Sequence, residues 1–169
     1  MAFFREEIMN SVEISVKMES DAVEFYTKCA EKVQNPVGKK MFLSIAEDEK
    51  RHIELLGKLL KKLDMTVEKA SPIKAIQSIF AEMKDAMVSR IAATTDEMEA
   101  FRVAMEMEKQ GRDFYRKSAS DAPTPLEKKL FETLAEEEEE HFRVFSNTFE
   151  FMQNNSGWYL WEERGVIEG

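Results

Sequence analysis

An internal repeat constrains the fold of this 169-residue chain more than any other feature of its sequence. Shifting the sequence by 89 positions aligns residues 18–52 with residues 107–141, and 14 of these 35 positions are identical. Each copy contains two segments with helical spacing on either side of a short break with a proline, at residues 34–38 and 120–124. Two helical hairpins in one chain predict an all-α four-helix bundle.

The predicted helices cover residues 6–33, 37–63, 95–119 and 125–153. Between the hairpins, apolar residues at helical spacing follow Ser71-Pro72, which predicts an amphipathic crossover helix over residues 72–91. We therefore expect one domain over residues 1–153. Residues 154–169 form a C-terminal tail with Trp158, Tyr159 and Trp161, which we expect to pack on the bundle or on a partner chain.

Charge and cysteine content exclude several classes of function. A formal charge of −9 argues against a general affinity for nucleic acid or an anionic membrane, because both require a positive face. No apolar run reaches the length of about 18 residues that a membrane span needs, and the first residues are too acidic for a signal peptide, so we expect a cytoplasmic protein. Cys29 is the one cysteine, which excludes a Cys-x-x-Cys site within this sequence.

Each predicted helix carries a glutamate among the apolar residues of its core-facing side. In the second and fourth helices a histidine follows three residues later, which places both side chains on one face. The candidate metal ligands are Glu19, Glu49, His52, Glu108, Glu138 and His141. Four buried carboxylates need positive charge nearby. Arg112 would supply one charge, whereas two divalent metals would supply four. Carboxylate and imidazole ligands suit iron or manganese, and zinc is possible.

Other interpretations of these residues remain open at the level of sequence. The six candidate ligands could form a polar layer or a solvated helix face without metal, although their shared spacing favours metal. Tyr26 and Tyr115 are either packed core residues or groups that assist the site. Asp48 is placed to hold the second ring nitrogen of His52, and Glu137 that of His141; the alternative for both carboxylates is surface charge.

The motifs resemble those of the ferritin-like superfamily and, within it, of the rubrerythrin-like branch. The resemblance rests on Glu19 with Tyr26, Glu108 with Tyr115, and the segments Asp48-Glu49-Lys50-Arg51-His52 and Glu138-Glu139-Glu140-His141. It implies a ferritin-like four-helix bundle with a non-haem centre of two iron ions per chain. The centre would react with hydrogen peroxide or dioxygen, in subunits that pair as homodimers.

Two departures from the family pattern affect the predicted function. Rubrerythrins carry a rubredoxin domain with four iron-binding cysteines, which this sequence lacks, so electrons would come from a separate donor such as a rubredoxin-like protein. Gly111 stands where the family has a further glutamate. We expect an oxidoreductase that reduces hydrogen peroxide or dioxygen. The alternatives are a ferroxidase or iron-handling protein, which Gly111 favours, and a non-catalytic, metal-stabilised helical binding module.

Overall fold

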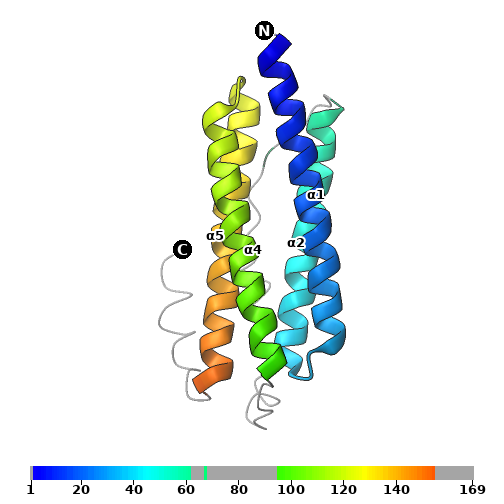
Figure 1. The fold of residues 1–169 in the computed structure, drawn as a ribbon, viewed down its shortest axis with the longest axis vertical. Helices are drawn as coiled ribbons and strands as arrows, with labels where there is room; N and C mark the ends of the chain where they lie inside the picture. The colour runs from blue at the N-terminus through cyan, green and yellow to red at the C-terminus, as the bar shows by residue number, and fades with distance from the viewer. Residues whose placement is uncertain (1, 62–66, 68–94, 155–169) are drawn as a thin grey trace.

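The computed structural model describes residues 2–61, 67 and 95–154 of the chain. These residues form four helices (Figure 1): α1 (Ala2–Lys32), α2 (Pro36–Leu60), α4 (Thr95–Asp121) and α5 (Pro125–Asn154). The predicted all-α bundle of two hairpins is confirmed. The main difference from the predicted boundaries is α1, which starts four residues earlier, at Ala2. The predicted crossover helix at residues 72–91 and the aromatic tail from residue 155 lie outside the described residues.

The two hairpins lie side by side along the long axis of the bundle (Figure 1). Within each hairpin the helices pack closely; between the hairpins, α1 meets α4 and α2 meets α5. Glu97 in the first turn of α4 accepts hydrogen bonds from the backbone N–H groups of Gln34 and Asn35 in the α1–α2 connection. This contact places the start of α4 at the α1–α2 turn, which is the opposite end of the bundle from the end of α2.

In both hairpin turns a side chain caps the start of the helix that follows. Asn35 is the N-cap of α2, and its side-chain oxygen accepts hydrogen bonds from the backbone of Val37 at 2.9 Å and Gly38 at 3.3 Å. At the start of α5, Thr124 and Glu127 form a reciprocal capping box with two backbone hydrogen bonds of 3.2 Å. Proline follows each cap, where its missing N–H costs nothing.

The core consists of two apolar clusters with a polar layer between them. The cluster near the α1–α2 turn is built on aromatic rings that pack at centroid distances of 4.8–6.0 Å: Tyr26, Phe42, Phe101 and Phe145. The second cluster includes Leu56, Tyr115, Phe131 and Leu134. These clusters hold the four helices in fixed register around the polar layer. Among the described helices, none combines the length and apolar character needed to cross a bilayer.

Candidate metal centre

All six predicted ligands meet in the polar layer. They come from all four helices, and each is at most 4 % exposed: Glu19 from α1, Glu49 and His52 from α2, Glu108 from α4, and Glu138 and His141 from α5. The two imidazole rings stack with their centroids 5.7 Å apart. The helical spacing that identified these residues in the sequence therefore corresponds to a single cluster in space.

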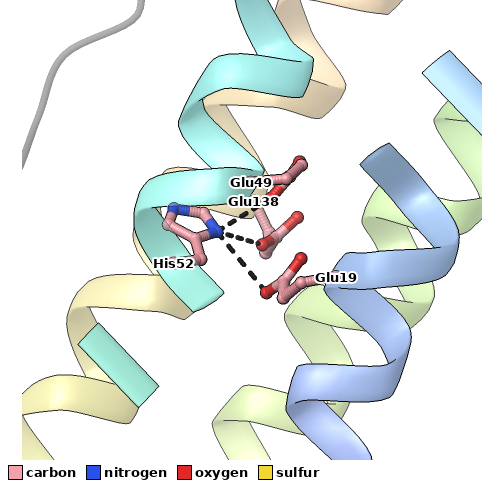
Figure 2. Close-up of side chains that lie close together, drawn as sticks. All are labelled: Glu19, Glu49, His52 and Glu138. Carbon is pink, nitrogen blue, oxygen red and sulfur yellow. Dashed lines mark ion pairs between the residues drawn. The ribbon is translucent and has the colours of Figure 1, made fainter. Parts of the chain in front are cut away.

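The cluster divides into two overlapping groups of four ligands. In the first group, the Nδ1 atom of His52 faces three carboxylates (Figure 2): Glu49 at 2.8 Å, Glu138 at 3.3 Å and Glu19 at 3.4 Å. The donor atoms of each group lie within 4.8 Å of one another, which is close enough to share one metal ion.

The second group is arranged in the same way around the other histidine. The Nδ1 atom of His141 lies 3.1 Å from Glu49, 3.4 Å from Glu108 and 3.9 Å from Glu138. Glu49 and Glu138 belong to both groups. Two cations could therefore be held here, one by Glu19 and His52 and the other by Glu108 and His141, with Glu49 and Glu138 available to both.

Unsatisfied polar atoms test whether these residues fit a metal. Buried polar atoms normally have hydrogen-bond partners. Within the described part of the chain, the buried side-chain atoms without one include both carboxylate oxygens of Glu49, one oxygen each of Glu108 and Glu138, and Nδ1 of both histidines. These six atoms belong to the two ligand groups; further atoms without a partner are Nε2 of His141 and Nε of Arg51. The donor set therefore fits two metal ions, and carboxylates with imidazoles suit iron or manganese.

Each tyrosine of the repeat donates a hydrogen bond to a glutamate of the other hairpin. Tyr26 of α1 donates to Glu108 of α4, and Tyr115 of α4 donates to Glu19 of α1. Burial and the charge of the accepting glutamate raise the pKa of both tyrosines well above its usual value, so both hydroxyls stay protonated. The sequence left the role of these residues open; the structure places both beside the candidate ligands.

The second nitrogen of each histidine faces a carboxylate from the other hairpin. The Nε2 atom of His52 lies 2.8 Å from Glu137, and that of His141 lies 3.4 Å from Asp48. The sequence pairing, Asp48 with His52 and Glu137 with His141, was therefore wrong, and the carboxylates are exchanged. Residues i and i+4 share one face of a helix, so Asp48 and His52 both project toward α5. Each histidine therefore lies next to a carboxylate of the opposite helix rather than one of its own helix.

Arg112, which at the level of sequence could supply one positive charge to the carboxylates, pairs with other residues. Its guanidinium forms ion pairs with Asp113 and Glu139, at 2.9 and 2.8 Å. Gly111, the preceding residue of α4, is buried. A Cβ atom at Gly111 would lie 3.4 Å from a carboxylate oxygen of Glu138. The helix thus presents its smallest residue to the ligand layer.

Charge is distributed unequally among the four carboxylates of the metal-free cluster. Burial raises the pKa of Glu19 and Glu108 well above its usual value, and the charges of Glu49 and Glu138 raise it further. Burial also acts on Glu49 and Glu138, but hydrogen bonds and the neighbouring histidines outweigh it and lower their pKa. Negative charge therefore concentrates on the two carboxylates that both ligand groups share.

The histidines compensate part of this charge when no metal is bound. Burial alone would lower the pKa of His52 and of His141, but the charge of Glu49 and hydrogen bonds to neighbouring carboxylates outweigh it. The pKa of both imidazoles is consequently raised well above its usual value. Protons thus partly replace the positive charge that two metal ions would supply.

A pocket of about 180 Å³ reaches the ligand layer between α1 and α4. All four glutamates line it, whereas neither histidine does. Gly111 and Ala22, which occupy equivalent positions in the two repeats, line the pocket as well, together with Met18 and Met107. Small residues at these positions leave room for a molecule to approach the carboxylate side of the cluster.

Comparison with known proteins agrees with this arrangement. A sequence model of the rubrerythrin family matches residues 10–148, and a second match covers residues 99–164. This chain belongs to the rubrerythrin family. The second rubrerythrin match begins in the second hairpin, in keeping with the internal repeat. Family membership and the buried glutamate and histidine cluster together indicate a metal site of the di-iron type.

One solved structure shares this fold. It is a protein from Pyrococcus furiosus that is described as hypothetical, with 22% sequence identity and a TM-score of 0.65. The alignment covers 87% of this chain and 90% of that one. At this identity the similarity concerns the fold alone. No curated protein sequence shows a significant match.

Proposed function

We propose that this chain is a non-haem di-iron oxidoreductase that reduces hydrogen peroxide or dioxygen. The observation that carries the proposal is the pair of four-residue ligand groups that share Glu49 and Glu138. A site for one structural ion would not need this second set of ligands. The pocket between α1 and α4, which reaches the same carboxylates, supports a centre that small molecules can enter.

Two iron ions bound in this layer would supply the two electrons that reduce one hydrogen peroxide, with two protons, to two water molecules. The protein's own residues would fix the spacing of the ligands and keep bulk water out. Ile45 on one side and Leu56, Leu134 on the other belong to the apolar clusters that border the layer. Tyr26 and Tyr115 would orient Glu108 and Glu19 through their hydrogen bonds.

The proposal requires a reductant from outside these residues. Cys29 is the one cysteine of the sequence, so these residues contain no rubredoxin-type iron site. We propose a separate electron donor, such as a rubredoxin-like protein, that restores the reduced state after each turnover. Pairing of two chains into a homodimer, which the family resemblance implies, stays a prediction.

Stopped-flow oxidation tests this function directly. Protein loaded without oxygen with two Fe(II) per chain is mixed in parallel with hydrogen peroxide and with dioxygen, and formation of Fe(III) is followed by absorbance. We expect fast oxidation by peroxide.

Glu49→Gln should abolish this oxidation, because Glu49 belongs to both ligand groups. Glu47→Gln is the matched control, since Glu47 is exposed and pairs with Lys50 on the surface. Unchanged turnover in Glu49→Gln, or no reaction of the wild type with either oxidant, would overturn the proposal.

A second variant tests the route to the site. Gly111→Leu would fill the space between α4 and Glu138, where even a Cβ atom makes contact at 3.4 Å. We expect slower oxidation with two Fe(II) still bound, and a smaller effect for Gly111→Ala. An oxidation rate in Gly111→Leu equal to that of the wild type would show that oxidant reaches the centre by another route.

A ferroxidase is the second candidate function, in which Fe(II) is the substrate. Gly111 favours it, because the further glutamate of the family pattern is missing at this position and the pocket leaves the carboxylate layer accessible. The same experiment distinguishes the two functions. Faster oxidation by dioxygen than by peroxide, with continued consumption of Fe(II) beyond two ions per chain, would identify a ferroxidase.

A further inference from the structure

The two ligand groups are nearly symmetric in their ligands but differ in what holds their histidines. Glu137, which accepts from His52 at 2.8 Å, has a side chain only 1% exposed. Asp48, which faces His141 at 3.4 Å, has a side chain 21% exposed. Water therefore competes for Asp48, whereas it has almost no access to Glu137.

Arg51 accounts for a second difference between the groups. Its guanidinium donates to the same oxygen of Glu137 that accepts from His52. Arg51 spans from the surface to this contact, since its side chain is 29% exposed. The repeat places Glu140 at the equivalent position, one residue before His141, so the second hairpin carries an anion where the first carries this cation.

We propose that Arg51 is a positioning residue that makes the two metal sites unequal, with the His52 site binding a divalent cation more tightly than the His141 site. Arg51 and His52 together restrain Glu137, and the restrained carboxylate fixes the orientation of the His52 ring. Outer carboxylates of this kind typically change metal affinity by about 10–100-fold when removed. Asp48, at a longer distance and exposed to water, restrains His141 less. This inference rests on the two-metal centre of the proposed function.

A histidine-specific measurement can locate the site that loses its metal first. The sequence contains only two histidines, so ¹⁵N labelling of histidine gives one set of signals for each site. Chain loaded with two Zn²⁺ is titrated with a chelator, and the ring signals are followed by NMR. His141→Gln assigns the signals. Starting from the loaded chain makes the result independent of how well the metal-free chain folds.

In the wild type, we expect His141 to lose zinc first, at a chelator concentration at least about ten-fold below that needed for His52. In Arg51→Gln the two losses should fall within about three-fold of each other, since the restraint on Glu137 is weaker. Arg51→Lys keeps the positive charge and should largely preserve the order. Lys50→Gln is the control: Lys50 is the adjacent cation, but it pairs with Glu47 on the surface, so its loss should leave the order unchanged.

The possible failures are distinguishable. Loss of zinc from His52 first, or from both histidines together in the wild type, would overturn the inference and leave the di-metal centre intact. An unchanged order in Arg51→Gln would assign the difference to the protein surroundings other than Arg51 and would also overturn it. Absence of zinc-bound signals from both histidines would overturn the di-metal centre itself, and the inference with it.

Discussion

At the scale of single residues, the two tyrosines show how the repeat builds one site from two hairpins. Tyr26 and Tyr115 occupy equivalent positions in the two copies of the repeat. Tyr26 of α1 donates to Glu108 of α4, and Tyr115 of α4 donates to Glu19 of α1. Each hydroxyl thus satisfies one oxygen of a buried carboxylate. Removing either hydroxyl leaves that oxygen of a buried carboxylate without its protein donor.

Tyr26→Phe is therefore expected to lower the free energy of unfolding of the metal-free chain by about 1–3 kcal/mol, the usual cost of an unpaired buried polar group. Tyr115→Phe should have a similar effect, because Glu19 is buried to nearly the same degree as Glu108. Urea denaturation in the presence of a chelator measures both. Wild-type midpoints in the two variants would contradict the structural role of these hydrogen bonds.

The sequence predicted those features of the centre that depend on the spacing of residues within one helix. Spacing within a helix placed Glu49 with His52 on one face. The exchange of Asp48 and Glu137 between histidines was not predictable, because it depends on how two helices from different hairpins face each other. Arg51 was missed for the same reason. The one available signal was that its equivalent in the repeat is Glu140.

At the scale of elements, two glycines of α2 show where helix packing is tightest. A Cβ atom at Gly38 would lie 3.0 Å from Val33 and 3.3 Å from Phe101, at the turn where α1, α2 and α4 meet. Nothing lies within 4 Å of the same position at Gly57. The first glycine permits a close approach of helices, whereas the second has no such role.

Gly38→Ala is expected to destabilise the chain by about 1–3 kcal/mol, because overpacking forces neighbouring groups to shift. Gly57→Ala should instead stabilise it by roughly 0.5–1 kcal/mol, since alanine is the better helix former. The pair provides its own control, because the chemical change is identical in one helix. Thermal and urea unfolding of the two variants would measure it, and equal effects of the same sign would contradict the packing argument.

The hairpins were predictable because their signals are local. A short break with a proline marks each turn, and apolar periodicity marks the helices, so the predicted starts of α2 and α5 agree with the observed ones to within one residue. The first helix begins earlier than predicted because residues 2–5 include no helix breaker. The packing of Gly38 against Phe101 of α4 depends on contacts between hairpins, which local signals do not report.

At the scale of the whole molecule, the ligand layer opposes folding of the metal-free chain. The pKa of Glu108 is raised because burial and its neighbours disfavour the ionised form in the folded state. For a carboxylate with a raised folded pKa, this cost is absent below the unfolded pKa and grows as the pH rises through the folded pKa. At neutral pH the fold therefore keeps a destabilising group, which is useful when the site binds metal.

Glu108→Gln should consequently have opposite effects with and without metal. The amide removes the charge and its oxygen still accepts from Tyr26, so the metal-free variant should be more stable than the wild type at pH 7, with the advantage lost at acid pH. In excess Zn²⁺ the order should reverse, because the wild type gains about 2.7 kcal/mol per site at a hundred-fold excess over the dissociation constant, and the variant lacks one ligand of the second group. Urea denaturation in chelator and in zinc, across pH, measures both effects.

Glu106→Gln, an exposed change on the same helix, should follow the wild type throughout. A metal-free Glu108→Gln less stable than the wild type, or equal stabilisation of both by zinc, would show that the buried acidic layer is maintained for a reason other than metal binding.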